Sequence, residues 1–345
     1  MNTLDSVKNY YGRVLQTKAD LKTTACCTAE SFPHYMRPLA SKVADEVQEK
    51  FYGCGAPFPY ALRGATVLDL GCGTGRDVFL LAQLVGEEGR VIGVDMTDEQ
   101  LEVGRRHVDE HMKRFGYAKS NVELKQGYIE DLKSLGIEDE SVDVVVSNCV
   151  CNLSPEKERV FREAFRVLKP GGELYFSDVY VDRRLPEACQ KDEVLLGECL
   201  GGAMYTEDFR RLMAKVGCED VRQVRSAPID IVDPEIQRKV GNARFVSITF
   251  RAFKTPLEDR CEDFGQVATY LGTIPHAPNA WALDDHHLFE RGRPMLVCAN
   301  SAAMLQETRF KEHFRIDGNK DTHFGLFDCG PVPTGTSEDS GGACC

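Results

Sequence analysis

The run Leu68-Asp69-Leu70-Gly71-Cys72-Gly73-Thr74-Gly75 constrains the fold more than any other part of the chain. It begins inside a short apolar and β-branched run, residues 66–70, which predicts a buried strand. Three glycines at alternate positions then let the backbone turn sharply and approach a ligand closely. A helix is predicted from about Arg76 to Val85, so the run is a strand, a glycine loop and a helix.

The same alternation of strand and helix continues to about residue 182. The predicted strands are 66–70, 91–95, 122–127, 142–147 and 173–179. The predicted helices between them are 76–85, 98–115 and 155–168, the last followed by the turn Lys169-Pro170-Gly171-Gly172. This spacing indicates right-handed βαβ units and an α/β fold with a doubly wound, Rossmann-like parallel sheet.

The ends of the chain have a different pattern. Residues 1–60 are predicted to form a helical cap, and 61–182 the doubly wound domain. Residues 183–255 and 256–330 predict smaller α+β additions, including helices at 192–200, 206–216 and 300–310 and a strand at 245–250. Residues 331–345, rich in Pro, Gly, Ser and Thr and ending in Cys344-Cys345, predict a disordered tail.

Charge and hydropathy exclude several classes of function. The net charge is −12, from 42 Lys and Arg against 54 Asp and Glu, and no basic cluster offsets it. We therefore expect no nucleic-acid or anionic-membrane partner, and a small-molecule substrate instead. No stretch approaches the ~20 apolar residues of a membrane span. The first residues lack a signal-peptide pattern, so we expect a cytoplasmic protein with reduced thiols.

The glycine loop indicates which cofactor it binds. A dinucleotide site favours G-x-G-x-x-G, but the residue three after Gly73 is Arg76. Asp69, just before the loop, would repel a pyrophosphate and would suit a cofactor with a cationic amino-acid end. Asp95 ends the second strand, where a carboxylate can bind ribose hydroxyls.

These features, with Ile129-Glu130-Asp131 after the third strand and the Lys-Pro-Gly-Gly turn, resemble the class I S-adenosylmethionine-dependent methyltransferases over residues 61–182. The resemblance implies a role for eight residues around S-adenosyl-L-methionine. Asp69, Gly71 and Gly73 would line its methionine end, Asp95 its ribose, Met96, Ile129 and Glu130 its adenine, and Asn148 the methyl-transfer position.

The acceptor position carries thiols rather than a base. Cys149 follows the fourth strand, and Cys199 lies just beyond the sheet. Cys26-Cys27 and Cys54 lie in the N-terminal segment. Oxygen and nitrogen acceptors usually need a general base, whereas soft thiolates select thiophilic centres. Trivalent arsenic held by up to three thiolates keeps a lone pair that can attack a sulfonium methyl group, so no base is required.

Several phrases resemble the arsenite S-adenosylmethionine methyltransferases, most closely the algal enzymes, over about residues 1–275. The phrases are Val7–Gly12, Tyr52–Gly55, Val94–Thr97, Ser147–Val150, Gly197–Gly202 and Cys261–Gln266. The resemblance implies that Cys149 and Cys199 bind As(III), that Cys26 and Cys54 help to capture it and keep it trivalent through a disulfide relay, and that Tyr11 reaches the cofactor. It also implies Cys54 as a third arsenic ligand, 183–255 as the arsenic-binding region, and a thiol reductant of the glutathione or thioredoxin type.

Two alternatives remain open from the residues alone. One is a class I methyltransferase acting on a small organic metabolite, and the other is a thiol-rich metalloid chelator without methyl transfer. The remaining cysteines within the folded region are interpreted as packing residues. They are Cys72, Cys151, Cys189, Cys218, Cys261, Cys298 and Cys329.

Overall fold

The structure is a computed structural model that describes residues 33–51, 53 and 55–329. The predicted roles of Tyr11, Cys26 and Cys54 therefore fall outside the described residues. Between residues 33 and 60 the chain forms short helices. They are η4 (His34–Met36), α2 (Arg37–Ala40) and α3 (Asp45–Glu49).

Alternating strands and helices follow from residue 66. They are β1 (Thr66–Leu70), α4 (Arg76–Val85), β2 (Arg90–Asp95), α5 (Asp98–Phe115), β3 (Val122–Gln126), η5 (Lys133–Leu135), β4 (Val142–Asn148), η6 (Cys151–Leu153), α6 (Lys157–Val167) and β5 (Leu168–Val181). The predicted strands and helices up to residue 168 are confirmed, and the bounds of β1, α4 and α5 agree with the prediction.

The next segment adds helices and the far edge of the sheet. It contains α7 (Glu187–Gln190), α8 (Glu193–Gly197), β6 (Met204–Tyr205), α9 (Thr206–Val216), β7 (Val221–Ile229), α10 (Pro234–Val240) and β8 (Phe245–Phe253). Helix α8 is shorter than the predicted 192–200, because the backbone at Cys199 adopts a positive φ that a right-handed helix does not allow.

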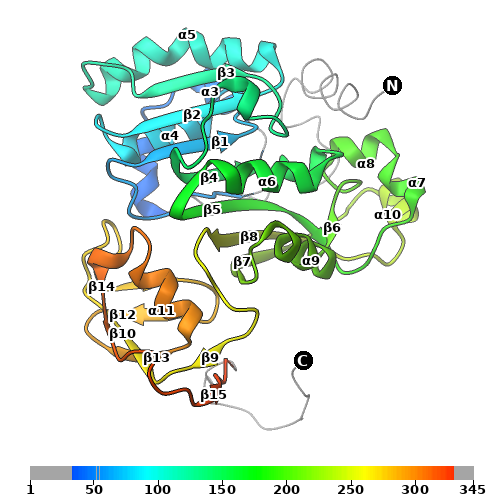
Figure 1. Cartoon of the computed structure of the whole chain (residues 1–345). Coiled ribbons are helices and arrows are strands. Elements are labelled where there is room, and N and C mark those ends of the chain that lie inside the picture. Colours follow the sequence, from blue (N-terminus) through cyan, green and yellow to red (C-terminus); the bar gives the residue numbers. More distant parts are fainter. Residues whose placement is uncertain (1–32, 52, 54, 330–345) are drawn as a thin grey trace.

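The central sheet has the order β3-β2-β1-β4-β5-β8-β7, with β6 paired to β5 (Figure 1). Strands β1 to β5 are parallel, as predicted. The prediction of a purely parallel sheet is incomplete, because β8 runs antiparallel to β5 and β7 antiparallel to β8. Strand β5 begins at Leu168, earlier than predicted, because the Lys-Pro-Gly-Gly turn forms an irregularity within the pairing with β4.

Side-chain alternation along the strands produces two hydrophobic cores, one on each face of the sheet. Leu68 and Leu70 of β1 pack with Phe161 of α6 and with residues of α9. Val67, on the opposite face, packs with residues of α4 and with the short helices of residues 33–49. The chain thus covers both faces, as a doubly wound sheet requires.

A C-terminal segment (yellow to red in Figure 1) packs beyond β7 and β8. Its elements are β9 (Glu262–Asp263), β10 (Gln266–Tyr270), β11 (Ala280–Ala282), β12 (Leu288–Glu290), β13 (Pro294–Val297), α11 (Ala299–Gln306), η7 (Lys311–His313), β14 (Phe314–Asp317) and β15 (Gly325–Leu326). Strands β13, β10 and β14 form one small sheet, and β11–β12 and β15–β9 form two separate antiparallel pairs. Helix α11 is shorter than the predicted 300–310.

A buried ion-pair network connects this segment to the main sheet. Glu173 of β5 binds the guanidinium groups of Arg251 in β8 and Arg309 after α11. Arg251 also donates to the carbonyl oxygen of Leu283, in the C-terminal segment. Among the described residues, no helix is long and apolar enough to cross a membrane.

Candidate active site

An open cavity lies where the order of the strands reverses, at the carboxyl ends of β1 and β4. This is the usual ligand position of an open α/β sheet. All eight described residues that were predicted to contact the cofactor line it, together with Cys149. They are Asp69, Gly71, Gly73, Asp95, Met96, Ile129, Glu130 and Asn148.

The glycine loop between β1 and α4 forms one wall of the cavity. Gly71, Gly73 and Gly75 have φ values of 70°, 53° and 86°, in the left-handed region that favours glycine. A Cβ atom on Gly71 would lie 2.3 Å from a methyl carbon of Val150. The backbone N–H of Gly73 donates to the Asp95 carboxylate at 2.9 Å, which fixes the loop beside the end of β2.

Asp69 presents an unpartnered carboxylate oxygen beneath this loop. Its side chain is buried, and its Oδ2 atom accepts no hydrogen bond among the described residues. Burial raises the pKa of the Asp69 carboxyl well above its usual range, and the carboxylates of Asp77 and Asp95 raise it further. A buried acid with a free oxygen and acidic neighbours favours a cationic ligand group.

The cavity lining also combines acidic and apolar groups. Asp95 accepts from the backbone N–H groups of Gly73 and Thr97, one on each oxygen, at 2.9 and 2.8 Å. Glu130 is buried and accepts from the hydroxyl of Ser154. Ile129 lies beside it and supplies an apolar surface.

Asn148 ends β4 and holds a neighbouring loop against the sheet. Its Oδ1 accepts from the backbone N–H of Gly55 at 3.1 Å, and its Nδ2 donates to the Gly55 carbonyl oxygen at 2.9 Å. Nδ2 also donates to Asp77 at 3.0 Å. Gly55 packs closely on Ser177, where an added Cβ would lie 2.6 Å from the hydroxyl oxygen. The side chain of Asn148 therefore positions Gly55 as well as lining the cavity.

Cys149 and Cys199 share an unusual backbone conformation. Their φ values are 60° and 61°, and only three other described non-glycine residues have positive φ. The left-handed region costs an L-residue roughly 1–2 kcal/mol, and such strain clusters at functional sites. The Cys199 thiol contacts the carbonyl oxygen of Cys149 at 3.8 Å. The structure thus brings these two predicted arsenic ligands together, Cys149 at the cavity wall and Cys199 buried behind it.

Asn152 and Asp178, which no sequence pattern indicated, fix the loop after Cys149 to strand β5. Asp178 accepts from the backbone N–H and the side-chain amide of Asn152 at 3.0 and 2.8 Å. Burial raises the pKa of Asp178 to about 6, although these hydrogen bonds lower it. A Cβ on Gly202 would lie 2.1 Å from the Asn152 carbonyl oxygen, so only glycine allows this approach. The pair Gly201-Gly202 was the one signal in the sequence.

The cysteines differ in covalent state and environment. The Cys149 sulfur takes part in a disulfide, whereas the other eight described cysteines form none. Cys151 packs in the core on the α6 side of the sheet, and Cys149 packs in a different cluster with Cys199. Burial raises the pKa of the Cys151 thiol to about 12, which agrees with its interpretation as a packing residue. Burial also raises the pKa of Cys72, in the glycine loop.

Other residues around the cavity could not be identified from sequence patterns. Lys50 and Phe51 reach it from the segment after α3, and the guanidinium carbon of Arg76 lies 3.1 Å from the ring centroid of Phe51. Tyr128 directly follows β3, and this position was its only signal. The further residues of the lining are Cys72, Thr74, Asp77, Thr97, Gln100, Gly127, Val150, Leu153 and Ser154.

Comparison with known proteins agrees with this geometry. A family model described as a methyltransferase domain matches residues 62–217. An arsenite methyltransferase of Aquipseudomonas alcaligenes is 56% identical over 94% of this chain and 94% of its own length. The arsenite methyltransferase of Homo sapiens is 45% identical over 90% of this chain and 82% of its own.

A solved structure shows the same architecture. It is the crystal structure of an arsenic (III) S-adenosylmethionine methyltransferase from Chlamydomonas reinhardtii, 53% identical to this chain with a TM-score of 0.83. The match covers 86% of this chain and 99% of that one. With a class I methyltransferase sheet and full-length relatives well above 30% identity, the chain belongs to the arsenite methyltransferase family.

Proposed function

We propose that this enzyme transfers methyl groups from S-adenosylmethionine to trivalent arsenic held by cysteine thiolates. The observation that carries the proposal is the pair Cys149 and Cys199, both in left-handed backbone. Cys149 lines the cavity, and the buried Cys199 thiol contacts the Cys149 carbonyl oxygen. A methyltransferase for an oxygen or nitrogen acceptor would need a general base near this point. Here Cys149 lines the cavity beside the end of β4, and its sulfur, once reduced, is a ligand for soft centres.

The residues of the cavity fit S-adenosylmethionine, which supplies an electrophilic methyl group when bound. The free oxygen of Asp69 would accept from the ammonium of the methionine end, beside Gly71 and Gly73. Asp95 would bind the ribose hydroxyls. Met96, Ile129 and Glu130 would hold the adenine, Asn148 would face the methyl-transfer position, and Tyr11 would reach the cofactor.

The arsenic needs positioning rather than proton transfer. Cys149 and Cys199, with Cys54 as a third ligand, would hold As(III) with its lone pair directed at the methyl carbon. A new carbon–arsenic bond forms from that lone pair, and the carbon–sulfur bond of the sulfonium breaks toward sulfur. The arsenic is thereby formally oxidised by two electrons. A pair of thiols can return these electrons by forming a disulfide, a relay in which Cys26 and Cys54 would take part.

We place the roles along the chain in the divisions predicted above. Residues 1–60 would cap the cofactor, 61–182 bind it, and 183–255 contribute the arsenic-binding region. Residues 331–345 would form the Cys-ending tail. We further propose a cytoplasmic location, where glutathione or thioredoxin is available as reductant.

Sustained turnover should depend on a thiol reductant. Each methyl transfer leaves two electrons to be supplied, and Cys149 must be reduced to bind arsenic. Once the reductant has been removed, we therefore expect a reduced chain to give at most about one methyl group per chain, and a chain with Cys149 in a disulfide to give none. Added glutathione or thioredoxin should restore continuous turnover. The measurement is methylated arsenic per chain over time, after reductant has been removed. Linear product formation without any reductant would contradict the relay.

Replacing Asp69 with asparagine should weaken cofactor binding. Loss of a buried charged hydrogen bond costs about 1.5–3 kcal/mol, so we expect the Kd for S-adenosylmethionine to rise about 10- to 100-fold by calorimetry. The free chain should not lose stability. The pKa of Asp69 is higher in the folded chain than in the unfolded chain, where it is about 4. Ionisation of Asp69 therefore lowers the free energy of unfolding as the pH rises above that unfolded pKa. Asparagine removes that cost.

The matched control is Asp109→Asn on the exposed surface of α5. It makes the same chemical change far from any buried charge, and it should leave the Kd unchanged. If Asp69→Asn bound the cofactor as tightly as Asp109→Asn, Asp69 would have no contact with the ammonium group.

The function itself is tested by incubating the chain with S-adenosylmethionine, arsenite and a thiol reductant, and then separating the arsenic species. Methylated arsenic supports the proposal. Its absence, with S-adenosylhomocysteine formed instead from a small organic acceptor, would favour the alternative of a metabolite methyltransferase. Tight arsenite binding without any methyl transfer would favour a chelator.

A further inference from the structure

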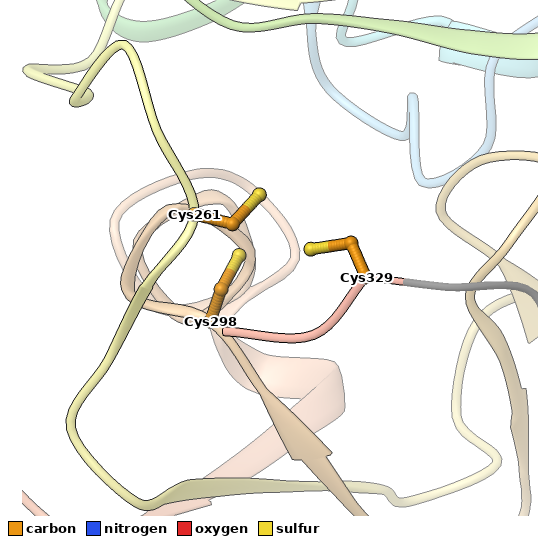
Figure 2. A group of neighbouring side chains, drawn as sticks. All are labelled: Cys261, Cys298 and Cys329. Atoms are coloured by element: carbon orange, nitrogen blue, oxygen red, sulfur yellow. The ribbon is translucent and has the colours of Figure 1, made fainter. Parts of the chain in front are cut away.

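Three cysteines that were interpreted as packing residues converge in the C-terminal segment. The sulfur atoms of Cys261, Cys298 and Cys329 all lie within 4.8 Å of one another. Figure 2 shows the three side chains directed toward a common point from three separate stretches of chain. All three are free thiols. A packing role would place each sulfur against carbon, whereas here the sulfurs face each other.

The fold holds each cysteine in place by backbone contacts. Cys298 is the N-cap of α11, directly after β13. Cys261 precedes β9, and its carbonyl oxygen accepts from the backbone N–H of Phe327 at 2.7 Å. This bond extends the β9–β15 pairing and brings the segment of Cys329 next to Cys261. The cluster is therefore built by the sheet pairing, not by chance surface proximity.

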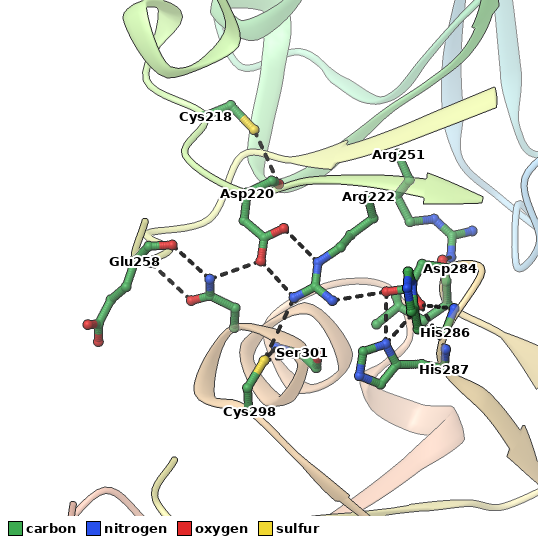
Figure 3. A network of polar contacts seen from close by, with 12 residues as sticks. Cys218, Asp220, Arg222, Arg251, Glu258, Asp284, His286, His287, Cys298 and Ser301 are labelled. Atoms are coloured by element: carbon green, nitrogen blue, oxygen red, sulfur yellow. Dashed lines mark hydrogen bonds and ion pairs between the residues drawn. The ribbon is translucent and has the colours of Figure 1, made fainter. Parts of the chain in front are cut away.

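Cys298 lies in surroundings that stabilise a thiolate. Its sulfur accepts from the backbone N–H of Ser301 at 3.4 Å and lies 3.7 Å from a guanidinium nitrogen of Arg222. Arg222 is held by Asp220 at 2.6 Å and Asp284 at 3.0 Å, as Figure 3 shows. Hydrogen bonding from Cys261 lowers the pKa of Cys298, and Arg222 lowers it further against the effect of burial. The pKa of Cys261 is correspondingly raised.

The three thiols differ in their exposure to solvent. Cys298 is buried, Cys261 is half-buried and Cys329 is exposed. A ligand arriving from solvent would meet Cys329 first and the activated Cys298 last. None of the three lines the cavity of the candidate active site.

We propose that Cys261, Cys298 and Cys329 form a second binding site for trivalent arsenic, as a three-thiolate complex. The choice of arsenic rests on the proposed function, and the choice of three ligands rests on the geometry. Arsenous acid would exchange its three As–O bonds for three As–S bonds, each thiol supplying the proton with which one hydroxyl leaves as water. No electron is transferred. Structural zinc prefers four ligands, and no fourth His, Cys, Asp or Glu joins this group among the described residues.

The test uses the full-length chain carrying Cys149→Ser and Cys199→Ser, which disables the proposed catalytic ligands. This chain is reduced, mixed with arsenite, desalted and analysed for arsenic per chain and for arsenic–sulfur coordination by X-ray absorption. Adding Cys298→Ser should remove one bound arsenic and weaken the affinity of this site by at least about 100-fold, since even residues behind metal ligands contribute 10- to 100-fold.

Two further variants keep the result interpretable. Cys329→Ser changes an exposed side chain, so it should remove the same arsenic with no effect on folding. Cys218→Ser changes a buried thiol outside the cluster and should keep the arsenic. Unchanged arsenic content in both Cys298→Ser and Cys329→Ser would overturn the proposal. So would retention of Zn(II) but not arsenite, or a disulfide in place of bound arsenic. Failure of the proposed function is a separate result, because it appears as missing methylated arsenic from the unmodified chain.

Discussion

Replacing Glu173 with alanine is expected to lower the free energy of unfolding by about 3–5 kcal/mol, the usual cost of removing one partner from a buried ion pair. Glu173 is fully buried between Arg251 and Arg309. Its removal would leave Arg251, itself 1% exposed, and Arg309 without their counter-ion. Urea unfolding followed by circular dichroism measures the change.

The matched control is Glu158→Ala. Glu158 also pairs with two cations, Arg162 and Lys215, but on the surface. Exposed ion pairs contribute little, so this variant should unfold close to the parent. Equal losses in the two variants would mean that Glu173 contributes no more than a surface charge and that the C-terminal segment is held by other contacts.

The second large effect is expected for Cys199→Ser. Serine keeps the size of the side chain but replaces a soft sulfur ligand with a hard oxygen. If Cys199 binds arsenic, the rate of methylated-arsenic formation at fixed arsenite should fall by more than about 100-fold, since loss of a direct ligand exceeds the effect of an indirect one. Binding of S-adenosylmethionine should be unchanged, because Cys199 does not line the cofactor cavity.

Cys189→Ser provides the comparison. Cys189 is a buried thiol in the same hydrophobic cluster, and its sulfur contacts the Lys239 carbonyl oxygen at 3.3 Å. Any general effect of placing a hydroxyl in this cluster would appear in both variants. Equal activity of Cys199→Ser and Cys189→Ser would remove Cys199 from the arsenic site.

Local patterns predicted the fold where the physical cause is local. The bounds of β1, α4 and α5 follow from short apolar runs, helical periodicity and glycine at helix ends, all of which act within a few residues. The antiparallel addition of β8 and β7 was not predicted. It depends on pairing between Glu173 and Phe253, and between other residues equally far apart, which no local pattern encodes.

The candidate site also has some features that local sequence patterns predict and others that depend on contacts between distant residues. The positions of Asp69 and Asp95 follow from the parallel sheet, which brings the ends of neighbouring strands to one edge. The link through Asn152 and Asp178, and the convergence of Cys261 with Cys298 and Cys329, depend on tertiary contacts between distant segments. For these cysteines the ordinary expectation of packing was the only one that the sequence supported.

The positive φ at Cys149 and Cys199 has a consequence for attempts to copy this site. A short peptide containing Ser147-Asn148-Cys149-Val150 would hold its cysteine mostly in extended or right-handed backbone. Arsenic binding would then have to impose the rarer left-handed conformation. The affinity of the peptide for arsenic would be lower by the free energy that this conformational change costs. Thiol count alone therefore does not reproduce the site; the folded sheet supplies the geometry before the ligand arrives.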